Sequence, residues 1–171
     1  MRRPVKGETI MAIRNIVERG DEILAKKCRE VKEVNDHIRM ILDDMLDTMR
    51  EANGVGIAAP QVGINRRMFI VEVDGETYEM INPVMLEQSG SQCEYEGCLS
   101  VPGLYGRVER PTYIKIAGLN RFGEPVEYEA EGFLATAFCH ENDHLDGQLF
   151  IDKAVDICTP EELMDEDDME E

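Results

Sequence analysis

The sequence of 171 residues has no tryptophan, few aromatic residues and half as many basic as acidic side chains. Its 18 Lys and Arg against 36 Asp and Glu give a formal net charge of −18 at pH 7. Such a surface repels phosphate backbones and anionic lipid, so bulk charge argues against binding to nucleic acid or a membrane surface. The length fits one compact domain better than two.

Long apolar runs are also missing. No run approaches the roughly 18 apolar residues that cross a bilayer, and the basic residues 1–7 are not followed by an apolar signal segment. The cysteines are Cys28, Cys93, Cys98, Cys139 and Cys158. This odd, scattered set does not indicate a disulfide framework. We therefore expect a cytoplasmic protein in which a special cysteine is a ligand or a nucleophile.

Two stretches have helical periodicity. From Asn35, apolar residues recur at i, i+3, i+4, i+7, i+8 and i+11, which predicts an amphipathic helix closed by Asn53-Gly54. The segment 133–144 contains no helix breaker and predicts a second helix. The acidic residues after Thr159-Pro160 predict a short helix with solvated charges.

The part of the chain between these helices is rich in short β-prone runs. They lie at residues 68–73, 77–81, 112–117 and 126–130. Gly, Pro, Asn and Asp separate them, and Asp74-Gly75 indicates a hairpin between the first two. A helix, several antiparallel strands and a second helix predict one α+β domain.

The sequence HENDH at residues 140–144 has the HExxH pattern. On a helix, residues four apart differ by about 40° of rotation and one turn of rise, so both imidazoles can reach one metal ion. Glu141 would project beside the ion, where a carboxylate can take a proton from a metal-bound water and pass it to a leaving amine. The alternative is a hydrogen-bonded pair of core histidines.

Two histidines are too few ligands for a catalytic metal site, so a third must come from elsewhere. The downstream candidates are Asp146, Asp152 and Asp156. The upstream candidate is Cys98, in the sequence EGCLS at residues 96–100. A thiolate held by a metal is deprotonated, whereas a lone cysteine is otherwise a small buried apolar residue.

The segment GVGIAAPQVG at residues 54–63 is rich in glycine and small apolar residues. Its glycines allow a backbone to approach another chain or a substrate closely. The segment lacks the Lys-Ser/Thr ending of a phosphate loop. Gln61 offers a neutral amide donor for an oxygen that gains charge in a tetrahedral intermediate. The alternative is a tight turn into a buried strand.

Together, GVGIAAPQ at 54–61, EGCLS at 96–100 and HENDH at 140–144 resemble the three ordered signature motifs of the peptide deformylase family. The resemblance extends from Met11 to about Lys153. It implies the α+β peptide deformylase fold, with antiparallel strands packed around a central HExxH helix and an N-terminal amphipathic helix. It also implies a metal-dependent hydrolase that removes the formyl group from the N-terminal formyl-methionine of newly made polypeptides.

The same resemblance divides the chain, together with the natural start that Met11 would make and the acidic composition after Thr159-Pro160. Residues 1–10 would be an upstream extension, residues 11–158 the catalytic domain and residues 159–171 an acidic tail. The metal ligands would be Cys98, His140 and His144, and Glu141 would be the general acid/base, acting on metal-activated water.

The resemblance also implies the groups that bind the substrate. Gln61 and the backbone N–H of Leu99 would stabilise the oxyanion, and Gly56 would hydrogen-bond the peptide main chain. The residues lining the pocket for the methionine side chain would include Val55, Phe133 and Ala137. The chain departs from the family at Cys139, where glutamine is common before the HExxH pattern.

One divalent metal is implied as the cofactor. A site of one cysteine and two histidines accepts Fe²⁺, Ni²⁺, Co²⁺ or Zn²⁺, and intrinsic affinity favours zinc over iron. The resemblance implies Fe²⁺ in the cell. Formyl-methionine nascent peptides would be the substrates, and the pairs Arg66-Arg67 and Lys26-Lys27 could make transient contact with the ribosome; no membrane or specific nucleic acid is expected.

Two other functions fit the motifs. One is an endopeptidase that uses the same HExxH chemistry. The other is a non-catalytic module that binds a metal or a peptide end. Glu141 argues against the module, because a structural metal site does not need a carboxylate beside its ligands.

Overall fold

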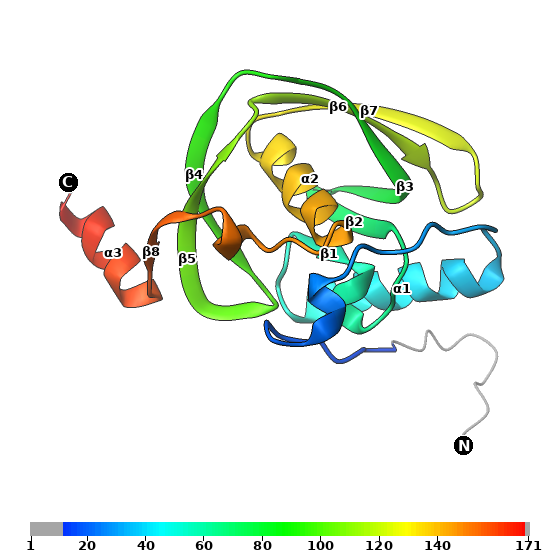
Figure 1. Cartoon of the computed structure of the whole chain (residues 1–171), viewed down its shortest axis with the longest axis horizontal. Coiled ribbons are helices and arrows are strands. Elements are labelled where there is room, and N and C mark those ends of the chain that lie inside the picture. Colours follow the sequence, from blue (N-terminus) through cyan, green and yellow to red (C-terminus); the bar gives the residue numbers. More distant parts are fainter. Residues whose placement is uncertain (1–11, 170–171) are drawn as a thin grey trace.

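The structure, a computed structural model, describes residues 12–169 (Figure 1). These residues form two antiparallel sheets. The larger sheet has the order β1-β2-β3-β6-β7, with β1 Gly56–Ala58, β2 Met68–Val73, β3 Glu76–Ser89, β6 Tyr113–Leu119 and β7 Pro125–Glu131. The smaller sheet has the order β4-β5-β8, with β4 Gln92–Cys98, β5 Val101–Arg110 and β8 Val155–Cys158.

The helices connect and cover these sheets. They are α1 Asp36–Glu51, α2 Gly132–Leu145 and α3 Pro160–Met169, with short 3₁₀ turns η1 Glu22–Ala25, η2 Ala59–Val62 and η3 Phe150–Asp152. Figure 1 shows α2 in the middle of the molecule, with β6 and β7 passing over it and β4 and β5 beside it. The mixture of helices and antiparallel strands agrees with the predicted α+β class.

Helix α1 confirms the periodicity prediction. The Asn35 side chain accepts a hydrogen bond from the N–H of Ile38 at 3.1 Å, which caps the first turn. The predicted apolar stripe packs against the larger sheet in a cluster that includes Leu42, Met45 and Ile70. Burial of this stripe is the main reason the helix is stable.

Helix α2 is the predicted second helix, and it packs against β1, β2 and β7. Phe138 is fully buried and meets Phe69 and Tyr78 edge to face, with ring centroids 5.8 and 5.3 Å apart. These contacts fix the rotation of α2, so that His140 meets Glu96 of β4 and Glu141 meets Gly56 of β1.

The strands agree with the predictions only in part. The hairpin is confirmed, because Asp74 and Gly75 both have positive φ angles of 53° and 78°, as a tight two-residue turn requires. The predicted strand at 77–81 is part of the longer β3, which continues past Pro83 through two register shifts. Strand β1 is the buried strand given as the alternative for residues 54–63, whereas β4, β5 and β8 were not predicted.

The other predictions have mixed outcomes. All five cysteines are free, as expected. The acidic tail begins with α3, the predicted short helix. The extension assigned to residues 1–10 lies outside the described part of the chain. Among the described residues, no helix is long and apolar enough to span a membrane.

Candidate metal centre and active site

Cys98, His140 and His144 come together in the structure. Cys98 ends β4, while the two histidines lie one turn apart on α2, with ring centroids separated by 5.1 Å. One potential ligand atom of each residue lies within 4.8 Å of the others. The Cys98 Sγ and His144 Nε2 are 3.4 Å apart. This is the ligand set that the sequence motifs indicated.

The three downstream aspartates have other roles. Asp146 pairs with Arg67 at 3.0 Å, and Asp156 faces Arg107 at 3.4 Å. Asp152 accepts a hydrogen bond from the Leu149 N–H at 3.0 Å. None of them belongs to the Cys/His/His group found among the described residues, so they are not the third ligand.

The chemistry of this group fits a transition metal. One thiolate and two imidazoles form a donor set that suits iron, cobalt, nickel or zinc. Burial lowers the pKa of His144 well below its usual range, so its ring is held in the neutral form that binds metals. The buried Glu141 Oε1 has no hydrogen-bond partner among the described residues. A polar atom left alone in this way is explained by a ligand or water.

A charged network behind His140 holds its ring in place. The His140 Nδ1 lies 2.8 Å from Glu96 Oε1. Arg110 donates two hydrogen bonds to the Glu96 carboxylate, at 2.9 and 3.0 Å, and a third to Asp143 at 2.6 Å. Although burial opposes the charge on Glu96, the hydrogen bonds from His140 and Arg110 hold its pKa below its usual range. The carboxylate thus stays ionised and orients the ring of His140.

Glu141 lies on the same helix and turns toward β1. It is 4% exposed, and burial raises its pKa to about 7. A carboxyl group with such a pKa can both accept and donate a proton near neutral pH. Its carboxylate faces Gly56 so closely that a Cβ at position 56 would overlap it. Glycine at this position therefore makes room for the acid.

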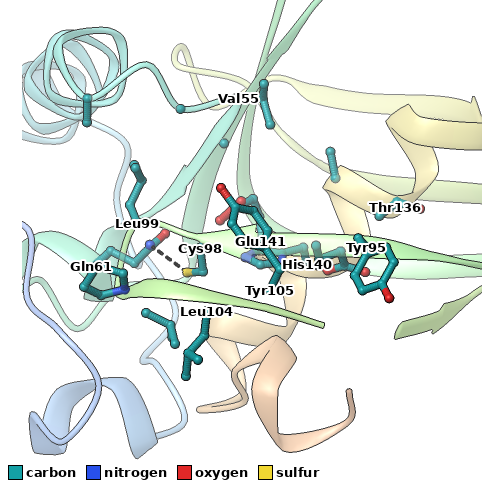
Figure 2. A pocket seen from close by; sticks show the side chains of 18 of the residues that line it. Val55, Gln61, Tyr95, Cys98, Leu99, Leu104, Tyr105, Thr136, His140 and Glu141 are labelled. Carbon is teal, nitrogen blue, oxygen red and sulfur yellow. Dashed lines mark hydrogen bonds and ion pairs between the residues drawn. The ribbon is translucent and has the colours of Figure 1, made fainter. Parts of the chain in front are cut away.

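The Gln61 side chain is fixed from both ends. Its Oε1 accepts a hydrogen bond from the Ala58 N–H at 2.9 Å, so its NH₂ group points the other way. That group donates to Ser100 Oγ at 3.1 Å and to Cys98 Sγ at 3.5 Å. Figure 2 shows the dashed contact from Gln61 to Cys98, with Leu99 beside it. The amide donor thus lies next to the ligand group.

A cavity of about 430 Å³ opens over these residues. Nine of the predicted site residues line it, and they are Val55, Gly56, Gln61, Cys98, Leu99, Phe133, Ala137, His140 and Glu141. His144, the remaining one, is 1% exposed. Lining residues that the sequence did not single out include Tyr95, Leu104, Tyr105 and Thr136.

The fold and the site together define a metallohydrolase of the HExxH type. The family model described as "Polypeptide deformylase" matches residues 13–159. The chain therefore belongs to the peptide deformylase family.

Relatives and solved structures agree with this assignment. A peptide deformylase of Acetivibrio thermocellus is 48% identical over 160 residues, covering 94% of this chain and 91% of that protein. One from Alkaliphilus metalliredigens is 50% identical over 145 residues, which are 85% of this chain and 99% of the relative. The crystal structure of the Thermotoga maritima peptide deformylase matches with a TM-score of 0.82 at 39% identity, covering 84% of this chain and 98% of that one. The predicted fold is thereby confirmed.

Proposed function

We propose that this protein hydrolyses the formyl group from the N-terminal formyl-methionine of newly synthesised polypeptides. The observation that carries the proposal is the Cys98, His140 and His144 group, with ligand atoms within 4.8 Å, directly beside the buried carboxyl group of Glu141. Membership of the peptide deformylase family supports the same reaction. The products would be formate and a peptide with a free amino terminus.

The metal would be held by Cys98, His140 and His144, and we propose Fe²⁺ as the ion used in the cell. A bound divalent ion supplies a Lewis acid that lowers the pKa of water toward neutrality. Zn²⁺, Ni²⁺ and Co²⁺ are compatible with the same donors.

Glu141 moves the proton. Its carboxylate accepts a proton from the attacking water, and its acid form then donates that proton to the nitrogen of the leaving amine. Burial raises the pKa of Glu141 to about 7 in the metal-free protein, and a bound cation would oppose this shift, so the acid/base role rests on the position of Glu141 beside the ligand group. The carboxyl group is thus suited to both steps of one turnover.

Gln61 and the Leu99 N–H would bind the oxygen of the formyl group as it gains negative charge. Both donors are neutral, and hydrogen bonds already orient the Gln61 side chain, so little reorganisation of that donor is needed when the charge develops. The hydrogen bonds from Ala58 and to Ser100 keep the amide of Gln61 aimed at the cleft.

The substrate peptide would lie along β1. This strand is at one edge of the larger sheet, so Gly56 has room to hydrogen-bond an extended main chain. Val55, Phe133 and Ala137 line the same cavity and would contact the methionine side chain. Val55 and Phe133 are 46% and 59% exposed, which leaves apolar surface for the substrate to cover.

The test is formate release from formyl-Met-Ala-Ser by protein purified without oxygen, with metal analysis of the same sample. We expect formate at a rate that depends on bound metal and no cleavage of internal bonds in unformylated peptides. Cleavage of internal bonds would favour an endopeptidase, and binding without turnover would favour a non-catalytic module. The iron proposal fails if metal-free protein reconstituted with Fe²⁺ is no faster than protein reconstituted with Zn²⁺.

A further inference from the structure

The segment of residues 12–20, here called the amino-terminal strap, crosses the molecule without forming a helix or a strand. It is anchored on α1 at Arg14. The Arg14 N–H donates to Thr48 Oγ1 at 2.9 Å, and its guanidinium group donates to Asp44 at 3.0 Å. Val17 packs against the apolar cluster that contains Leu24 and Val101. These contacts hold the strap in one place.

Two backbone groups of the strap bind segments that are far apart in the sequence. The Val17 N–H donates to the carbonyl of Gln61 at 2.8 Å, and the Arg19 N–H donates to the carbonyl of Ser100 at 2.8 Å. Gln61 lies in η2, and Ser100 lies in the turn between β4 and β5. The strap therefore links these two segments through their main chains.

The linked segments are those that carry the proposed oxyanion donors. Gln61 provides its side-chain amide, and Leu99 directly precedes Ser100. The side chains of Gln61 and Ser100 are 1% and 0% exposed and hydrogen-bonded to each other at 3.1 Å. A shift of either segment would change the distance between the two donors, and a displacement of about 1 Å can cost a hundredfold in rate.

We propose that the amino-terminal strap positions the oxyanion donors, with Val17 and Arg19 as positioning residues that act through the Gln61 and Ser100 carbonyls. This inference rests on the proposed function. The strap touches neither the substrate nor the metal ligands in this proposal. It sets the spacing between Gln61 and the Leu99 N–H.

Proline substitution tests the strap, because proline has no N–H to donate. Val17→Pro removes the hydrogen bond to Gln61. Glu18→Pro is the matched control, since the Glu18 N–H donates to no other described residue. We expect Val17→Pro to lower kcat about tenfold while KM and metal content stay within about twofold, and Glu18→Pro to leave all three near wild type.

A double variant separates positioning from general damage. In the Gln61→Ala background the amide is already gone, so adding Val17→Pro should lower kcat by less than about twofold. An equal loss of kcat in both backgrounds would overturn the proposal, as would a Val17→Pro variant as active as Glu18→Pro. If Val17→Pro does not fold, replacing Val17 with its α-hydroxy acid removes the same N–H without changing the side chain, and the same comparisons apply.

A measurement that needs no activity distinguishes this proposal from the proposed function. The chain has glutamines at positions 61, 88, 92 and 148, and ¹⁵N-glutamine labelling reports their side-chain NH₂ groups. We expect slow hydrogen exchange of the Gln61 NH₂ in wild type and Glu18→Pro, and faster exchange in Val17→Pro. Unchanged exchange would refute the strap proposal, whereas wild-type protein that releases no formate would refute only the function.

Discussion

The two sides of the cleft are held by different kinds of hydrogen bond. On the α2 side, His140 is supported by the charged groups of Glu96, Arg110 and Asp143. On the Gln61 side, comprising Gln61, Leu99 and Ser100, the contacts join neutral amide, hydroxyl and carbonyl groups, with the thiol of Cys98 at the edge. The difference follows from what each side would bind.

The α2 side would hold a permanent positive charge, which buried carboxylates stabilise. Glu96 and Arg110 are 8% and 5% exposed, and removing one of them takes two charged hydrogen bonds from the other, at a cost of about 3–5 kcal/mol. The Gln61 side would meet a negative charge only in the transition state. Neutral donors there favour that state without binding an anionic product such as formate tightly. Mutations on the α2 side should therefore mainly weaken metal binding, whereas mutations on the Gln61 side should mainly lower kcat.

The largest expected effect comes from Glu141→Gln, which removes the proposed proton acceptor between the two sides. We expect kcat to fall by about 10²- to 10⁴-fold, because the amide cannot take up or deliver the proton. The metal should stay bound, since the three ligands are intact. Formate release and metal analysis of the same preparation measure both. Glu127→Gln makes the same substitution at an exposed position on β7 and should leave kcat unchanged. Full activity of Glu141→Gln would show that Glu141 is not the general acid/base.

Next in size is Gln61→Ala, which breaks the Gln61 side alone. Loss of one preorganised donor should reduce kcat about 10²- to 10³-fold and leave KM almost unchanged. Metal affinity should change less than in variants of the α2 side, because the contact of Gln61 with a ligand is the long 3.5 Å hydrogen bond to Cys98 Sγ. Gln148→Ala, at an exposed position, controls for the loss of a glutamine side chain. A metal affinity weakened in Gln61→Ala as much as in Glu96→Gln would show that the two sides are not separate.

A smaller effect is expected from Glu96→Gln on the α2 side. The amide still fits between His140 and Arg110 but no longer supports the ligand with a negative charge, so metal affinity should fall about 10- to 100-fold. Competition with a chelator measures this change directly. Glu94→Gln, exposed on the same strand, is the matched control. Unchanged affinity in Glu96→Gln would mean that the network serves only the stability of the fold.

The features that could be predicted from the sequence are those set by neighbours in the chain. The α1 stripe, the Asp74-Gly75 turn and the one-turn spacing of His140 and His144 all follow from local geometry. The Cys98 ligand became predictable only when its motif was considered together with the other two. From residue spacing alone, the downstream aspartates were as plausible as Cys98 for the third ligand.

The features that were missed depend on pairing across the fold. Strands β4 and β5 contain glycine and proline and lack clear alternation, so only their mutual register defines them. Arg110 was not singled out from the sequence, because only that register places it against Glu96. The strap gave no signal either, because its role lies in backbone N–H groups that every residue but proline possesses.

The smallest expected effect concerns the carboxyl-terminal end of α2, at Leu145. We expect this end to be inaccessible to solvent, in contrast to the cleft. Cys28 is 4% exposed there, its N–H donates to the Leu145 carbonyl at 2.8 Å, and burial raises its pKa to about 11. Because the thiolate is the reactive form, only about one Cys28 in a thousand would be reactive at pH 8, and this fraction should rise about tenfold per pH unit up to about pH 11. Brief alkylation followed by peptide mass spectrometry should label the half-buried Cys93 well before Cys28, without loss of metal. If Cys28 is labelled as fast as Cys93 in folded protein, the end of α2 opens readily and the burial of Cys28 does not protect its thiol.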